Sequence, residues 1–103
     1  MIARYWSART SRDKAPHYAH HLETAVFAEL KELDGFRNAM LLQRDVDDEV
    51  EVVVITFWAS LESIRRFAGE PLDRAVVADR AMALLDDFDR KVRHFEVVLT
   101  FAG

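Results

Sequence analysis

Four short stretches of the chain are rich in apolar and aromatic residues, and polar turn residues separate them from their neighbours. These stretches predict strands over residues 2–9, 36–44, 50–58 and 94–101. The acidic run over residues 45–49 lies between the second and third stretches. It therefore predicts a solvated hairpin turn that joins two antiparallel strands.

Between the first two predicted strands, the apolar spacing changes to that of a helix. One stripe contains Ala15, Tyr18, Ala19, Leu22, Val26, Leu30 and Leu33. Gly35 lies where a C-terminal helix cap is expected. A second helix is predicted to begin after the N-cap residue Ser60 and to end near Gly69. Pro71 is expected to open a further short helix.

The order of these elements is strand, helix, strand, strand, helix, strand. This order predicts an α+β fold of the ferredoxin-like βαββαβ type, with an antiparallel sheet and helices on one face. Since the chain has 103 residues, it is expected to form a single domain over residues 1–103.

The third predicted strand is apolar on both of its faces. One face carries Val50, Val52, Val54, Thr56 and Trp58, and the other carries Glu51, Val53, Ile55 and Phe57. Two helices cover only one side of a sheet, so the second side would leave a large apolar patch exposed. We therefore expect a homodimer in which two sheets pack face to face as a dimeric α+β barrel.

Charge and composition exclude several classes of function. The chain has 14 Lys and Arg against 18 Asp and Glu, which argues against a nucleic-acid partner. It has no cysteine, no Gly-rich phosphate loop and no apolar run long enough for a membrane helix. The N-terminal residues do not resemble a signal peptide, so a cytoplasmic location is expected.

Three segments of the sequence, MIARYW at the N-terminus, ITFWASLESIRRFAGE in the middle and VRHFEVV near the end, resemble the antibiotic-biosynthesis-monooxygenase family. The resemblance implies a dimeric α+β barrel with a cleft between the sheet and helices of each subunit. Characterised members include cofactor-free oxygenases of anthrone-like polyketides, oxygenases of quinols and haem-degrading enzymes.

The catalytic residues of two branches are compared with this chain position by position. The Asn, Trp and His of the haem-degrading branch fall at Ser7, Phe67 and Val77, so haem degradation of that type is not expected. In the polyketide-oxidising branch the Trp matches Trp58. Its Asn and Tyr fall at Val54 and Ile64.

Five residues are candidates for the site, and each also has a structural interpretation. His94 is the candidate general base, or a half-exposed histidine at a strand start. Trp58 is a candidate catalytic indole and aromatic wall, or a core residue. Arg4 and Trp6 share a strand face and are expected to hold an anionic aromatic substrate, unless Arg4 pairs with an acidic neighbour and Trp6 fills the core. Tyr18 is expected to line the cleft or to pack in the core.

One histidine group invites a metal interpretation. His17 and His21 lie four residues apart, with His20 between them, which is a spacing that two zinc ligands can share. No third ligand is near in sequence, and the group lies off the apolar stripe. We therefore expect a solvated helix face and no metal site.

These observations lead to one functional hypothesis and one alternative. The hypothesis is a cofactor-independent monooxygenase that uses oxygen on a small aromatic, polyketide or quinol substrate. No metal, flavin or other cofactor is expected, because the substrate supplies the electrons. The alternative is a non-catalytic dimeric barrel that binds a small ligand or serves a stress response.

Overall fold

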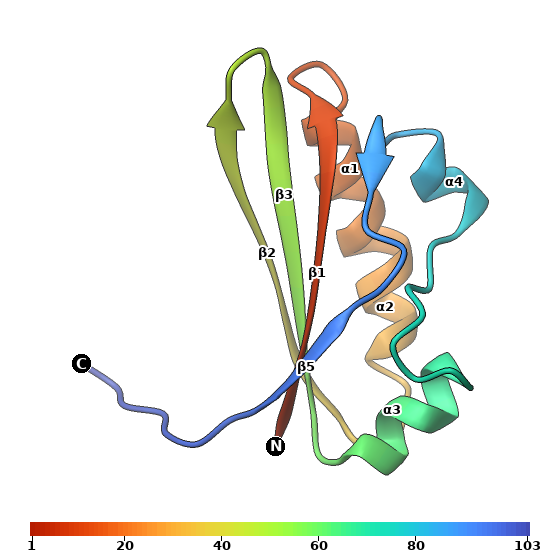
Figure 1. Ribbon diagram of the computed structural model, residues 1–103, viewed down its shortest axis with the longest axis vertical. Coiled ribbons are helices and arrows are strands. Elements are labelled where there is room, and N and C mark those ends of the chain that lie inside the picture. The colour runs from red at the N-terminus through yellow and green to blue at the C-terminus, as the bar shows by residue number, and fades with distance from the viewer.

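The computed structural model describes residues 1–103 and consists of one sheet with a layer of helices on one side (Figure 1). The elements in chain order are β1 (Ile2–Ser11), α1 (Ala15–His21), the π-helical turn η1 (Leu22–Val26), α2 (Phe27–Leu30), β2 (Phe36–Val46), β3 (Glu49–Trp58), α3 (Leu61–Ala68), α4 (Asp79–Met82), β4 (Asp87–Phe88) and β5 (Arg93–Glu96).

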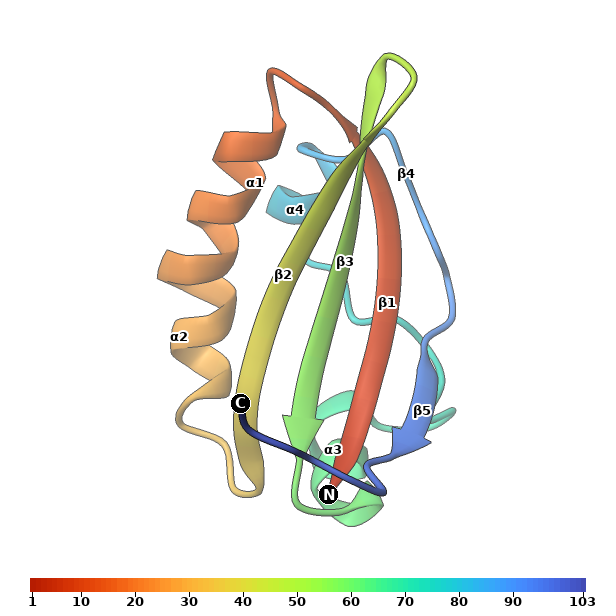
Figure 2. The same ribbon diagram turned by 90° about the vertical axis from the view of Figure 1, so that its left-hand side faces the viewer.

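The sheet is antiparallel, and its central strands are β3 and β1. β2 pairs with β3, β3 pairs with β1, and both β4 and β5 pair with the other edge of β1. Figure 2 shows β2, β3 and β1 side by side with α1 and α2 on one face. The predicted α+β, ferredoxin-like fold with helices on one face is confirmed.

Alternation along the strands divides the side chains between the two faces of the sheet. On the helix-covered face, Trp58 and Ile64 are fully buried with Leu30. The Trp58 ring stacks on Phe67 at 5.3 Å and meets Phe36 edge-on at 5.4 Å between centroids. The opposite face, called here the helix-free face, carries Tyr5, Met40, Leu42, Val53, Ile55, Phe57 and Phe95.

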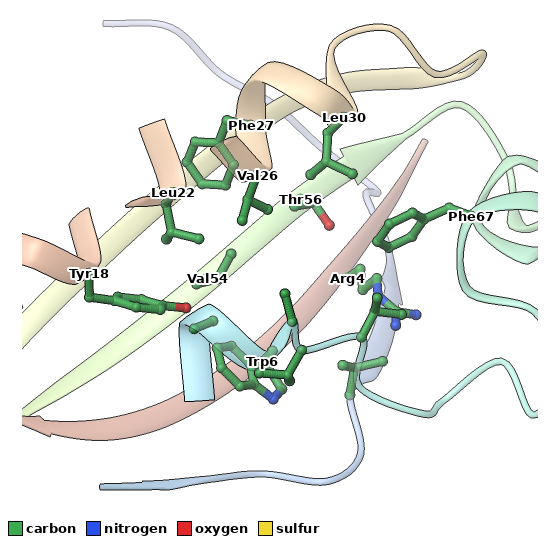
Figure 3. A pocket seen from close by; sticks show the side chains of 15 residues that line it. Arg4, Trp6, Tyr18, Leu22, Val26, Phe27, Leu30, Val54, Thr56 and Phe67 are labelled. Atoms are coloured by element: carbon green, nitrogen blue, oxygen red, sulfur yellow. The ribbon is translucent and has the colours of Figure 1, made fainter. Parts of the chain in front are cut away.

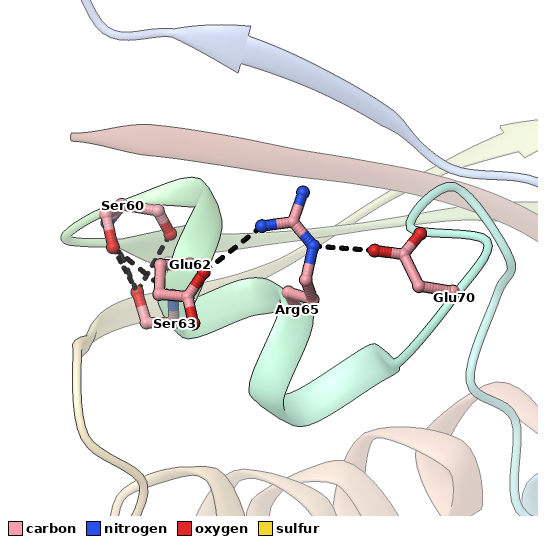
Figure 4. A network of polar contacts seen from close by, with 5 residues as sticks. All are labelled: Ser60, Glu62, Ser63, Arg65 and Glu70. Atoms are coloured by element: carbon pink, nitrogen blue, oxygen red, sulfur yellow. Dashed lines mark hydrogen bonds and ion pairs between the residues drawn. The ribbon is translucent and has the colours of Figure 1, made fainter.

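The ends of α3 follow the local sequence closely. Ser60 caps the helix by accepting from the Ser63 backbone N–H, while the Ser63 hydroxyl receives the Ser60 N–H (Figure 4). Gly69 ends the helix with φ at 73°. Gly35 has φ at 86° and lies against Ser63, so a Cβ at this position would overlap that side chain.

The helical layer differs from the predicted continuous helix. A π-helical turn over Leu22–Val26 interrupts it, and the α-helical part ends at Leu30. π-Helical turns often occur at functional sites. Here the turn lies beside an apolar cavity, and Leu22, Val26 and Phe27 line that cavity.

The expected helix at Pro71 was wrong. Residues 71–78 are irregular, and α4 begins only at Asp79. The physical reason is that the side chain of Arg4 binds the carbonyl oxygens of Leu72 and Arg74. These two hydrogen bonds from the buried guanidinium hold the segment against the sheet in an irregular conformation.

The last strand is shorter than predicted, since β5 covers Arg93–Glu96 only. β5 pairs with β1 from Arg93 opposite Tyr5 to Glu96 opposite Ile2, and the Val97 N–H then donates to the Met1 carbonyl. The C-terminal tail, residues 97–103, then projects away from the sheet on the side opposite the helices (Figure 1). None of the helices has the length and hydropathy needed to cross a membrane.

Candidate functional site

An apolar cavity of about 80 Å³ lies between the helix-covered face of the sheet and the helical layer (Figure 3). Thirteen of its 15 lining residues are hydrophobic. The helical layer contributes Tyr18, Leu22, Val26 and Phe27, and β3 contributes Val54 and Thr56. A concave apolar space with a few polar groups is the usual form of a small-molecule site.

One wall of the cavity is the irregular segment over residues 71–78. Val76, Val77 and Ala78 face the hollow from this segment. The segment is tied to the sheet by Arg4, whose Nη1 donates to the Leu72 carbonyl at 2.9 Å and whose Nη2 donates to the Arg74 carbonyl at 2.8 Å. A single side chain from β1 therefore sets the position of this wall.

Arg4 also determines the tautomer of His94, which lies opposite it in the register of β1 and β5. The Arg4 Nη1 lies 2.9 Å from His94 Nε2. A guanidinium only donates, so Nε2 accepts and the neutral imidazole carries its proton on Nδ1. Burial and the charge of Arg4 lower the pKa of His94, against an opposing effect of Asp73.

Arg4 remains a cation despite its surroundings. Its side chain is 5% exposed, and burial lowers its pKa to about 10. Its guanidinium binds two backbone carbonyls and His94, and the charge of Asp73 favours the protonated form without forming a direct ion pair. An anion that enters the cavity could therefore form a charge-assisted hydrogen bond with this guanidinium.

The indole of Trp6 lines the cavity from β1. Its Nε1 donates to the Asp89 carbonyl at 2.6 Å, and its ring packs against Phe88 with centroids 6.1 Å apart. Since the indole N–H is taken by backbone, Trp6 presents the cavity with a flat apolar ring and no hydrogen-bond donor.

Trp58 lies next to the cavity without lining it. It is fully buried, and its Nε1 donates to Thr56 Oγ1 at 2.9 Å. Thr56 does line the cavity and is 7% exposed. Sequence reasoning did not select Thr56, although a hydroxyl on an otherwise valine-rich strand face, two residues before a candidate indole, was a visible signal.

Tyr18 lies on α1 and faces the sheet, with only 1% of its surface exposed. Its side chain lines the cavity, and Figure 3 shows its hydroxyl directed inward. Burial raises the pKa of this phenol, so it stays protonated at neutral pH. Its hydroxyl has no hydrogen-bond partner within the protein.

The structure thus brings Arg4, Trp6 and Tyr18 together around one hollow. His94 contacts that group through Arg4, and Trp58 adjoins the cavity through Thr56 and through Phe67, on which its ring stacks. The three histidines of α1, His17, His20 and His21, lie in a separate shallow groove beside Arg80.

The model of a family described as antibiotic biosynthesis monooxygenase matches residues 1–79. Among solved structures, the chain is similar to a mutant of MhuD with two manganese protoporphyrin IX bound per active site, at TM-score 0.71 and 24% identity over 100% of both chains. It is similar to the heme-degrader MhuD from Mycobacterium tuberculosis, at TM-score 0.66 and 23% identity over 99% of this chain and 100% of that one.

A third similar structure is SnoaB, a cofactor-independent oxygenase from Streptomyces nogalater. Its TM-score is 0.62, and its identity is 19% over 99% of this chain and 98% of the other. At these identities the structural likeness establishes the fold. No curated protein matches the sequence.

Proposed function

Because this chain belongs to the antibiotic biosynthesis monooxygenase family, we propose that it is a cofactor-independent monooxygenase of a small aromatic, polyketide-like or quinol-type substrate. The observation that carries this proposal is the apolar cavity, whose few polar groups include a buried, protonated arginine. An aromatic anion is stabilised where a fixed positive charge meets a space from which water is excluded.

The proposed reaction uses electrons from the substrate alone. Removal of a proton from an activated phenol or anthrone-like methylene leaves an electron-rich anion, which reduces molecular oxygen. One oxygen atom is retained by the product as a new carbonyl, and the second leaves as water. The methylene carbon is oxidised and oxygen is reduced, so no other electron donor takes part.

The proton acceptor of this proposal is His94. Its Nε2 is neutral but engaged by the Nη1 of Arg4. We propose that the substrate oxyanion draws the guanidinium of Arg4 onto itself and thereby frees Nε2. The low pKa of His94 keeps the imidazole in its accepting form at neutral pH. Trp6 forms the aromatic wall, and Trp58 supports the site through Thr56.

A cavity of about 80 Å³ is smaller than the roughly 300 Å³ of common ligand pockets. A two- or three-ring substrate therefore needs the wall over residues 71–78 to move outward. Arg4 holds that wall through two carbonyls, so its movement toward an anion would release the wall in the same step.

We also propose that the protein is a homodimer through its helix-free face. Met40, Leu42 and Phe95 are 40%, 45% and 50% exposed on that face. The tail beyond it exposes Leu99 at 82% and Phe101 at 90%. A second copy would cover this apolar surface, which exceeds what a monomer normally leaves in water.

The test is oxygen uptake in chelator-treated buffer on a panel of anthrones, naphthols and hydroquinones. We expect wild-type protein to consume oxygen and His94→Ala to lose most of that activity. His94→Gln separates two roles, because the glutamine oxygen still accepts from Arg4 but cannot act as the base. His20→Ala is the control, since this histidine lies outside the cavity.

The expected pattern is activity lost in both His94 variants and kept in the control. Recovery in the Gln variant would assign His94 to holding Arg4 and remove it as the base. The absence of uptake by the wild-type protein across the panel would oppose the enzymatic proposal.

One observation favours a second candidate function, a small-ligand-binding barrel without chemistry. The cavity lining includes no carboxylate and no imidazole. A general base must come within hydrogen-bond reach of the proton that it removes. Saturable binding of the same aromatic compounds without oxygen uptake would support this candidate.

A further inference from the structure

The cavity contains two hydroxyl groups from opposite layers of the fold. Tyr18 contributes one from α1, and Thr56 contributes one from β3 (Figure 3). Every other side chain of the lining is apolar, except for the guanidinium of Arg4 and the indole of Trp6. The N–H of that indole already binds the Asp89 carbonyl.

The hydroxyl of Tyr18 is a donor without a partner. This hydroxyl opens onto the cavity, so a ligand there can accept its hydrogen bond. Tyr18 is 1% exposed, and its raised pKa keeps the proton on the oxygen. A group in this condition gains most from a ligand atom that accepts a hydrogen bond.

The hydroxyl of Thr56 is oriented by its neighbour. The indole Nε1 of Trp58 occupies one acceptor position of Thr56 Oγ1 at 2.9 Å. An indole N–H only donates, so the proton of Thr56 must point elsewhere. No protein group accepts it, and the side chain lines the cavity, which makes Thr56 a second donor to a ligand.

We infer that Tyr18 and Thr56 select ligands that present an uncharged carbonyl oxygen to the cavity, so that an aryl ketone is preferred over the hydrocarbon of the same shape. Two neutral donors match a neutral acceptor without burying a second charge. This inference rests on the proposed use of the cavity as the substrate site, and it names a feature of the substrate beside the group that ionises.

The test is a calorimetric or NMR titration with acetophenone and with α-methylstyrene, in which a methylene group replaces the carbonyl oxygen. Tyr18→Phe removes one hydroxyl and keeps the ring. Thr56→Val removes the other, and Thr56→Ser restores it. We expect Tyr18→Phe to weaken acetophenone binding about three- to tenfold and to leave α-methylstyrene binding unchanged. Thr56→Val should act in the same way, and Thr56→Ser should bind as wild type.

The outcomes separate this inference from the proposal on which it rests. If the wild-type protein binds neither compound, the cavity is not an aromatic site and both fail. If both compounds bind and neither hydroxyl deletion changes acetophenone binding, the donor assignment alone is overturned. Unchanged binding of α-methylstyrene also shows that each variant has kept its fold.

Discussion

The two faces of the sheet are built from alternate residues of the same strands, yet their apolar side chains have different surroundings. On the helix-covered face of β3, Val52 and Trp58 are 1% and 0% exposed. On the helix-free face of the neighbouring β2, Met40 and Leu42 remain 40% and 45% exposed. Hydrophobic residues thus occupy both faces, but the helices of this chain bury only one.

This difference supports the separate roles that we propose for the two faces. The helix-covered face is buried and contains the cavity, where single hydroxyls and one guanidinium are the available polar groups. The helix-free face is open, and charged residues such as Arg44 and Glu51 lie at one end of it. The first face therefore suits a small ligand, and the second suits a large apolar surface such as another copy of the chain.

The largest expected effect comes from neighbouring aromatic residues on opposite faces. Trp58→Ala should destabilise the fold by about 3–5 kcal/mol, because it leaves a cavity beside Phe67 and Ile64. Phe57→Ala should lower the free energy of unfolding less in dilute protein than in concentrated protein, where the proposed dimer would cover the helix-free face. Urea unfolding at two protein concentrations measures both. Equal losses at both concentrations for Phe57→Ala would contradict a covered helix-free face.

A charged side chain introduced on the helix-free face should disrupt the proposed dimer without unfolding the chain. Ile55 lies between Tyr5 and Met40 in the register. Ile55→Asp should weaken the dimer by about 100-fold or more, because burial of an unpaired carboxylate is costly. Light scattering coupled to size exclusion gives the mass, and Asp48→Asn at the hairpin tip is the control. A variant that remains dimeric would place the interface elsewhere.

The fold could be predicted from the sequence because the alternation of apolar and polar residues in strands and the capping residues of helices are local signals. The strand over Val50–Trp58, the cap at Ser60 and the stop at Gly69 depend on residues within a few positions of one another. The shape of segment 71–78 was not readable, because it depends on contacts with Arg4 almost seventy residues earlier.

The candidate site was only partly readable for the same reason. Periodicity placed Arg4 and Trp6 on one strand face and Tyr18 on the apolar helix stripe, and the three residues line the cavity. Periodicity predicts which face of a strand or helix a residue occupies, but it does not predict how deeply the residue is buried. It therefore did not show that Trp58 lies beneath Thr56, or that His94 is separated from the cavity by Arg4.

A moderate effect is expected from the titration of His94. Its pKa is lowered in the folded protein, so the unfolded chain binds the proton more readily. The stabilising contribution of the neutral form is complete above the unfolded pKa near 6.5, and it is lost as pH falls toward the lower folded value. Burial is the main cause of the lowered pKa of His94, the charge of Arg4 adds to it, and the charge of Asp73 opposes it.

Urea unfolding between pH 8 and pH 5, a range of about three units around the histidine pKa, measures this dependence. We expect His94→Gln to reduce the loss of stability on acidification, because the glutamine keeps an acceptor for Arg4 and does not titrate. The other three histidines are present in both proteins, so the difference isolates His94. An identical pH profile for the two proteins would show that the Arg4–His94 contact does not persist in solution.

The smallest effect is expected at α3, where polar contacts lie in solvent. Arg65 bonds Glu62 at 3.1 Å and Glu70 at 2.6 Å (Figure 4), and these bonds raise its pKa. Exposed pairs of this kind contribute little, and salt screens them. Arg65→Gln should therefore lower Tm only slightly at low salt and not at all near 1 M salt, where the Debye length is about 3 Å. A large, salt-independent loss would mean that surface polar contacts stabilise this fold as much as the apolar packing on the helix-covered face, and the contrast between the faces would then no longer follow from burial alone.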